Sequence, residues 1–284
     1  MSPADSQPPS PDRPDREAPA PDEAPEAAPP PRDEVLSLEL AQLGLADPLR
    51  WLALGWRDFM RCPRIGLFYG LCFCLMGQAL WRVFQSAPEY MLALSAGFLL
   101  VGPFLCLGLY DASRALERGP GCPSLAGTLT AWKVRKGEMA LFAGVLLILE
   151  LVWARASVVV FAVTFNAMPS TEHLLTELLR LENIEFLVSY TVVGAIFAGL
   201  IFVTSVISIP MILDLQVDAV SAGLTSLRAC GQNPGVMLLW GALITLLIGL
   251  AMLPGFLGLL VAAPVVGHAS WHAYRQIVPA PAGG

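Results

Sequence analysis

The sequence predicts an all-α membrane protein with six transmembrane helices, arranged as three parallel two-helix repeats with interfacial amphipathic helices. Three observations lead to this prediction. The chain has 284 residues, of which 55% are hydrophobic and only 14% are charged, whereas soluble domains carry about 25% charged residues. Six apolar segments each have close to the roughly 20 residues that cross a hydrocarbon core. Short motifs recur in three of these segments and group the six into pairs.

Residues 1–33 are expected to form a disordered cytoplasmic tail, followed by an integral membrane domain over residues 34–278 and a short C-terminal tail over residues 279–284. The first segment is rich in proline, alanine and acidic residues. It has too little apolar surface to offset the entropy lost on ordering. Because the formal net charge of −6 comes largely from this tail, the remaining chain is near neutral and no nucleic-acid partner is indicated.

Between Glu34 and Cys62 the chain takes on a helical periodicity. Large apolar side chains recur at spacings of three and four, and charged side chains occupy the other faces. The apolar positions are Leu49, Leu52, Trp56 and Phe59. This pattern predicts an amphipathic helix that lies on the membrane surface.

The six apolar segments follow this helix, and their lengths predict one transmembrane helix each. They are Ile65–Phe84, Tyr90–Tyr110, Met139–Phe165, Phe186–Leu213, Val236–Met252 and Pro254–Trp271. A second amphipathic helix is expected at the membrane interface between the fourth and fifth segments. Its apolar stripe is Val217, Val220, Leu224 and Leu227, and its polar stripe is Asp218, Ser221, Thr225 and Arg228.

Basic residues gather on one side of the membrane when the six segments alternate in direction. They are Arg50, Arg57, Arg61, Arg64, Arg114, Arg118, Lys133, Arg135, Lys136, Arg228 and Arg275. The opposite side receives only Arg82 and Arg180, together with an acidic loop. The positive-inside rule therefore predicts that both termini are cytoplasmic. The strong preference for arginine over lysine is compatible with a GC-rich bacterial genome.

Three prolines mark the internal repeat. The prolines are Pro103, Pro210 and Pro264, and the polar residues eight positions later are Asp111, Asp218 and His272, each followed by alanine. Each copy is a two-helix hairpin, and copies of equal orientation are related by an axis along the membrane normal. The prolines should kink their helices and free a carbonyl one turn earlier. In the fourth segment, Thr204, Ser205 and Ser208 are placed to satisfy the freed groups.

Four stretches carry a resemblance to a known family. They are SxxSIPMILD, SLRACGQNPGVMLLWG, GHASWHAYR and the GP-x6-YDASR motif at Gly102–Arg114. Together they resemble a family of bacterial predicted integral membrane proteins, domain of unknown function 2189, over about Val35 to Val278. The resemblance implies a six-span inner-membrane protein with no established activity.

The six cysteines, Cys62, Cys72, Cys74, Cys106, Cys122 and Cys230, form no CxxC pair. We expect them to be free apolar thiols, with no disulfide framework and no zinc site. His268 and His272 are four residues apart and should share one helix face. Two imidazoles do not complete a metal site, so hydrogen bonding at the interface is favoured over a metal or haem, and no cofactor is predicted.

Glu150 falls near the middle of the third segment, where a carboxylate is energetically expensive and is a candidate for transport or proton transfer. Arg155 lies five residues later, on another helix face, and is a poor partner for it. The alternative is a protonated carboxyl group that is hydrogen-bonded to a neighbouring helix.

The repeat predicts a polar layer at the cytoplasmic mouth. Asp111, Asp218 and His272 would lie at one depth, Asp214 and His268 one turn deeper, and Arg114 and Arg275 just outside, where they can pair with the carboxylates. One hypothesis, which we favour, is that these groups hydrogen-bond neighbouring helices and anchor helix ends. The other is a shared site that binds a cation or relays protons.

The sequence contains no hydrolase, metalloprotease or nucleotide-binding motif, so we expect no enzyme. The leading interpretation is a non-enzymatic inner-membrane protein that scaffolds, assembles or regulates a membrane complex. The alternative is a small-solute or ion transporter with a polar site at the cytoplasmic mouth. The expected partners are the lipid bilayer and other membrane proteins.

Overall fold

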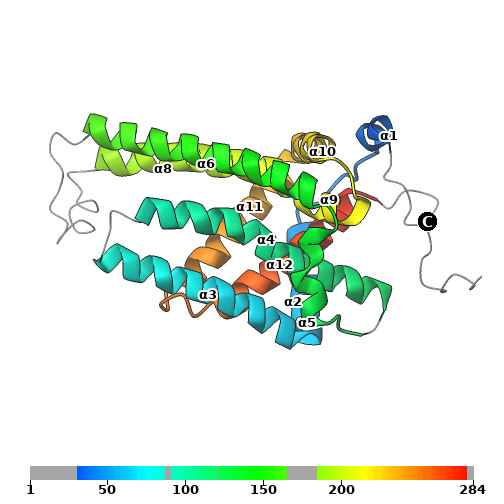
Figure 1. Cartoon of the computed structure of the whole chain (residues 1–284). Coiled ribbons are helices and arrows are strands. Elements are labelled where there is room, and N and C mark those ends of the chain that lie inside the picture. Colours follow the sequence, from blue (N-terminus) through cyan, green and yellow to red (C-terminus); the bar gives the residue numbers. More distant parts are fainter. Residues whose placement is uncertain (1–30, 87–90, 120, 165–183, 280–284) are drawn as a thin grey trace, which may run out of the picture.

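A computed structural model describes residues 31–86, 91–119, 121–164 and 184–279, and within these ranges the regular structure is helical, without strands (Figure 1). The helices are α1 Arg32–Ser37, α2 Asp47–Arg61, α3 Pro63–Ser86, α4 Met91–Arg118, α5 Leu125–Leu129, α6 Lys136–Thr164, α8 Ile184–Ser205, α9 Ser208–Leu215, α10 Ala219–Gln232, α11 Pro234–Met252 and α12 Leu259–Ile277, with a 3-10 turn at Ala131–Lys133. Residues 1–30 of the predicted disordered tail lie outside the described residues. Residues 31–33, the end of the predicted tail, are described, and helix α1 begins there at Arg32.

Four of the described helical stretches are long and apolar enough to cross a membrane. They are Pro63–Ser86, Lys136–Val163, Ile184–Leu215 and Pro234–Met252, and they correspond to predicted segments one, three, four and five. Most side chains in these stretches are not buried within the protein, as helices surrounded by lipid require. The protein is therefore a multi-span helical membrane protein. Figure 1 shows α3, α4, α6 and α8 side by side, with the short helices gathered at one end.

Predicted segments two and six form α4 and α12, which are not among those four stretches. Helix α12 is the central element of the fold and packs against α2, α3, α4 and α11. Its surface carries small residues such as Ala263, Gly267 and Ala273, and most of its side chains are buried. Because protein covers this helix, it does not need the apolar surface that lipid demands. Its contacts thus explain its lower hydropathy.

Two glycines allow the neighbouring helices to reach the backbone of α12. A Cβ atom on Gly55 of α2 would lie 2.5 Å from the Val265 carbonyl oxygen, and one on Gly70 of α3 would lie 2.1 Å from the Leu260 carbonyl oxygen. The Leu260 carbonyl is the one that Pro264 leaves without its helical donor, since proline has no N–H. Close approach of a glycine Cα places a weak C–H donor there.

The predicted kink in segment four is a full break between α8 and α9, at Val206 and Ile207. The hydroxyls of Thr204 and Ser205 donate to the Ile201 carbonyl, and Ser208 donates to the Thr204 carbonyl. These hydroxyls therefore bond to carbonyls within the last two turns of α8 and not to the Val206 carbonyl, which is the one that Pro210 leaves without a helical donor, so the prediction that they satisfy it is wrong. By contrast, α4 and α12 run on through Pro103 and Pro264 without interruption.

The break also depends on a residue of α10. The Ser226 hydroxyl donates to the Val203 carbonyl at 2.6 Å and accepts from the Ile207 amide at 3.3 Å. Both backbone groups lie at the break, where the helical pattern no longer supplies partners. The serine therefore fixes the end of α8 to α10.

The amphipathic helices α2 and α10 turn their apolar stripes away from the protein. On α2, Leu49 and Trp56 are 62% and 50% exposed, whereas Trp51, Gly55 and Asp58 are buried, and α2 packs against α12. Phe59 is an exception to the predicted stripe because it is buried, against Gly66 of α3. On α10 the predicted stripe members Val220, Leu224 and Leu227 are exposed, and the small or polar residues Ser221, Ala222, Thr225 and Ala229 are buried. The fourth predicted member, Val217, lies before the start of α10 and is buried. This orientation suits helices that lie on a membrane surface.

The segment before α2 is tied down by two polar residues of the α10–α11 region. Arg228 donates to the carbonyls of Leu36 and Leu38. Asn233 accepts from the Leu43 amide at 2.9 Å and donates to the Ala41 carbonyl at 3.1 Å. Arg228 therefore orders the backbone of the N-terminal segment, in addition to its position among the basic residues.

Candidate functional site

Charged and polar side chains converge where α2, α4, α9 and α12 meet. We call this set the polar cluster: Asp58, Asp111, Ser113, Arg114, Glu117, Asp214, His268, Trp271, His272, Tyr274 and Arg275. Two of the four helices, α4 and α12, contribute most of it. Their residues reach the cluster because both helices continue beyond the ends of their predicted spans.

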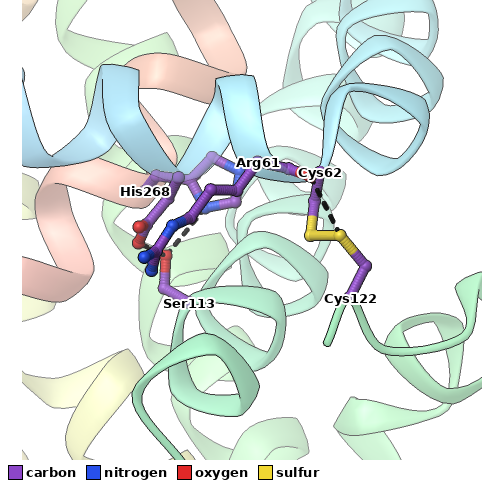
Figure 2. Close-up of a disulfide and its surroundings, with 6 residues drawn as sticks. Arg61, Cys62, Ser113, Cys122 and His268 are labelled. Carbon is purple, nitrogen blue, oxygen red and sulfur yellow. Dashed lines mark hydrogen bonds between the residues drawn. A yellow bond between two sulfur atoms is a disulfide. The ribbon is translucent and has the colours of Figure 1, made fainter. Parts of the chain in front are cut away.

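The inner part of the polar cluster is centred on Asp58, which is only 3% exposed. Its Oδ2 accepts from the Ser113 hydroxyl at 2.9 Å and from His272 Nε2 at 2.7 Å. Ser113 Oγ also lies 2.8 Å from His268 Nδ1, and Figure 2 shows these two side chains directed toward one another. Because serine has one proton and gives it to Asp58, His268 Nδ1 must donate to Ser113. The result is a continuous chain from His268 through Ser113 and Asp58 to His272.

The protonation of Asp58 follows from these contacts. Burial raises the pKa of the Asp58 carboxyl, but the hydrogen bond and charge of His272, with the hydrogen bond from Ser113, outweigh burial and hold this pKa below its ordinary value. Asp58 is therefore ionised at neutral pH. A buried carboxylate is tolerated when it is paired and hydrogen-bonded in this way.

The outer part of the polar cluster is centred on Arg275. Its guanidinium lies 3.2 Å from Glu117 Oε2 and 3.2 Å from Asp214 Oδ2. Trp271 Nε1 donates to Glu117 at 3.0 Å, and the Tyr274 hydroxyl donates to Asp214 at 2.9 Å. Burial and the nearby Asp214 carboxylate raise the pKa of Tyr274 well above its ordinary value, so Tyr274 remains a donor. These contacts join α12 to α4 and α9.

Arg114 forms a second link between α4 and α9. It lies 2.6 Å from Asp111 Oδ1 on its own helix and donates to the Leu213 carbonyl at 2.9 Å. That carbonyl belongs to the last turn of α9, where helical carbonyls lack partners. The arginine thus caps the end of α9 while its charge is balanced by Asp111.

Six of the eight candidate residues named from the sequence meet in the polar cluster: Asp111, Arg114, Asp214, His268, His272 and Arg275. Asp218 does not join them. It caps α10 by accepting from the amides of Val220 and Ser221 at 3.1 and 2.9 Å, and Arg32 lies 3.9 Å away. Glu150 lies elsewhere, in a cavity between α6 and α8.

The sequence reasoning missed Asp58, Ser113, Glu117 and Tyr274. Asp58 lies seven residues after Trp51 and three after Gly55, so these three positions share one helix face. Because Gly55 is small and Asp58 is charged, the sequence pattern of this face is not typical of a buried face. Ser113 and Glu117 are four residues apart on α4, and that spacing was the signal available for them.

The inner part of the polar cluster contains the residue types of a Ser–His–Asp triad, but their order is different. In a triad the histidine lies between serine and aspartate, and the serine is accessible. Here Ser113 lies between His268 and Asp58 and is fully buried. His268 and His272 each direct a ring nitrogen to a different protein partner. Among the described residues no group of three or more His, Cys, Asp or Glu side chains is placed to hold a metal ion.

A disulfide joins Cys62 and Cys122 next to the polar cluster (Figure 2). The prediction that all six cysteines are free is wrong for this pair, although Cys72, Cys74, Cys106 and Cys230 are free. Helix α4 continues to Arg118, two turns past its predicted end, and carries the next loop back to the α2–α3 junction. There the two Cα atoms are 5.7 Å apart. A contact across 60 residues is not visible in cysteine spacing.

With this geometry in place, the chain can be compared with known proteins. It matches the family described as predicted integral membrane protein (DUF2189). The match covers residues 91–214, from the start of α4 to Asp214 in α9, and confirms the resemblance. Asp111, Arg114 and Asp214 lie inside the matched stretch, whereas Asp58 and the α12 residues lie outside it. Neither curated proteins nor solved structures gave a match.

Proposed function

We propose that this protein is a non-enzymatic component of a bacterial inner membrane, and that it scaffolds, assembles or regulates a membrane complex. The observation that carries this proposal is the internal pairing of the carboxylates in the polar cluster. Asp58, Asp111, Glu117 and Asp214 each have a donor or a cation from the protein itself. Groups paired in this way hold helices together and are not open to a substrate. The cavities beside Arg64, Pro103, Glu150 and Gly241 are lined by other residues.

We further propose six membrane crossings, in which α4 and α12 also span, with both termini on the cytoplasmic side. The basic residues at the polar-cluster end support this orientation. The exposed apolar stripes of α2 and α10 suit the same interface. The threefold repeat is supported by Pro103 and Pro264, which both lie in the interior of a continuous helix, α4 and α12. The middle copy differs, because the chain breaks before Pro210 and Asp218 becomes a helix cap.

Affinity purification of the tagged full-length protein in mild detergent tests the proposed role. We expect one or a few membrane proteins to co-purify in fixed ratio, and a tag on that partner to recover this chain in return. Purified protein in sealed vesicles should show no solute or proton flux above empty vesicles. Flux by the pure protein, with no stoichiometric partner, would contradict the proposal.

A second candidate function is proton or ion transport. The chain from fully buried His268 to partly exposed His272 favours it, because aligned hydrogen bonds between titratable groups can relay protons. His268→Gln and His272→Gln distinguish the candidates, since each roughly keeps the shape and much of the hydrogen bonding while removing a titratable end of this chain. If both variants accumulate normally and cells lose the function, transport gains support. If both fail to accumulate, the residues are structural.

A further inference from the structure

Glu150 is a buried carboxylate that the polar cluster does not use. It is the middle residue of the 29-residue helix α6, about 21 Å along the helix from either end, and it is 5% exposed. Its Oε1 atom has no hydrogen-bond partner among the described residues. A carboxyl group without a partner at mid-membrane depth is energetically expensive and needs an explanation.

The neighbouring side chains do not supply that partner. Arg155 lies five residues along α6, on a different face, and is exposed. Ser205 is close by, but its hydroxyl donates to the Ile201 carbonyl at 2.6 Å. Within the described part of the chain no side chain therefore satisfies Oε1, so this oxygen is open to a partner from outside the protein.

Glu150 lines a cavity of about 390 Å³ between α6 and α8. The other lining residues are mainly apolar or aromatic, among them Trp153, Phe197, Ile201 and Phe202. Gly194 lies opposite Trp153, where a Cβ atom would be 3.8 Å from the indole nitrogen. A second cavity of about 520 Å³ between α8 and α11 shares Ala198 and Phe202 with the first. The two cavities together can hold a bulky apolar molecule.

We propose that this cavity binds a lipophilic cation, with Glu150 as its counter-ion. A cation would pair with the carboxylate and leave the complex neutral, which is the least costly state in hydrocarbon. Aromatic side chains such as Trp153 attract cations to their ring faces. The apolar lining suits the body of the ligand. This site is separate from the polar cluster and does not depend on the function proposed above.

The binding of tetraphenylphosphonium, a permanent lipophilic cation, tests the proposal. The full-length protein is placed in nanodiscs of phosphatidylcholine, which carry no net charge, and radiolabelled probe is titrated by equilibrium dialysis. We expect saturable binding of one probe per chain above the level of empty nanodiscs. Glu150→Gln, which removes the charge and keeps the shape, should weaken binding at least tenfold. Glu185→Gln is the matched control, because Glu185 is an exposed residue of α8 outside the cavity.

A second variant keeps the test informative if Glu150→Gln does not accumulate. Ala198 is exposed and lines the cavity, so Ala198→Trp should fill the space without disturbing the fold. We expect it to abolish probe binding although Glu150 is intact. Binding by Glu150→Gln or Ala198→Trp at the wild-type level would overturn the proposal. Probe binding to the wild type that does not exceed the binding to empty nanodiscs would also overturn the proposal. A dimer of this chain that covers the cavity, and that dissociates when Glu150 is changed to Gln, would overturn it as well.

Discussion

The polar cluster and the α6–α8 pair both contain buried carboxylates, but the two regions differ in the hydrogen-bond partners that the protein supplies to them. In the polar cluster, Asp58 and Asp214 receive hydrogen bonds from other helices. On α6, Glu150 has an oxygen without a partner among the described residues, and Ile148, two residues before it, is 62% exposed. The first region is specified by contacts within the chain, whereas the second is completed by its surroundings. Substitutions should therefore destabilise the first region strongly and the second weakly.

Asp58→Ala should give the largest effect. It removes the acceptor shared by Ser113 and His272, so the buried Ser113 hydroxyl loses its acceptor and the Nε2 atom of half-buried His272 loses its partner, and we expect a loss of roughly 3–5 kcal/mol. Thermal unfolding in detergent measures it. Arg50→Ala, an exposed change on the same helix, is the control and should be near neutral. Equal effects of Asp58→Ala and Glu150→Gln would remove the contrast between the regions.

The disulfide sharpens the comparison and also tests the orientation. When Cys62 and Cys122 are oxidised, changing either to serine should lower stability by about 2–4 kcal/mol. If the polar-cluster end is cytoplasmic, both thiols should be reduced in growing cells, because disulfides rarely persist there. Alkylation of intact cells, followed by a gel-shift assay, reads out the thiol state. A fully formed disulfide in cells would contradict the proposed orientation.

Glycine substitutions compare the packing around α12, the helix that contributes most residues to the polar cluster, with the packing of the α6–α8 pair. Gly70→Ala would place a Cβ atom against the Leu260 carbonyl of α12, so we expect a loss of about 1–3 kcal/mol. Gly144→Ala on α6 and Gly199→Ala on α8 have no neighbouring atom within 4 Å. These two should be neutral or slightly stabilising, since alanine favours the helix. The unfolding temperatures of the three variants, measured side by side, test whether only Gly70→Ala lowers the stability.

Acid should weaken the polar cluster by a smaller amount. The pKa of Asp58 is lowered in the folded state, so its stabilisation is complete above the ordinary carboxyl pKa of about 4. It is lost as the pH falls from there through the lowered pKa, when the carboxylate is protonated. Unfolding temperatures between pH 7 and pH 3 should show this decline in the wild type and a shallower one in Asp58→Asn. Parallel curves would exclude this role for Asp58.

The sequence predicted the helices well because long apolar runs act locally. It did not predict which face of α2 is buried. Lipid accepts apolar side chains such as Leu49 and Trp56, so the rule that large apolar residues turn inward reverses at a membrane surface. The partners of Asp58 lie 55 and 214 residues away on α4 and α12, and no periodicity connects them. The Cys62–Cys122 pair was missed for the same reason.

The central claim is that the polar cluster fastens helices together, and a double-mutant cycle on Asp58 and His272 tests it most directly. Unfolding in detergent is measured for the wild type, Asp58→Asn, His272→Gln and the double variant. We predict that each single change is destabilising and that the two are coupled by about 1–3 kcal/mol, because they share one hydrogen bond. Single variants as stable as the wild type, with no coupling, would contradict the claim.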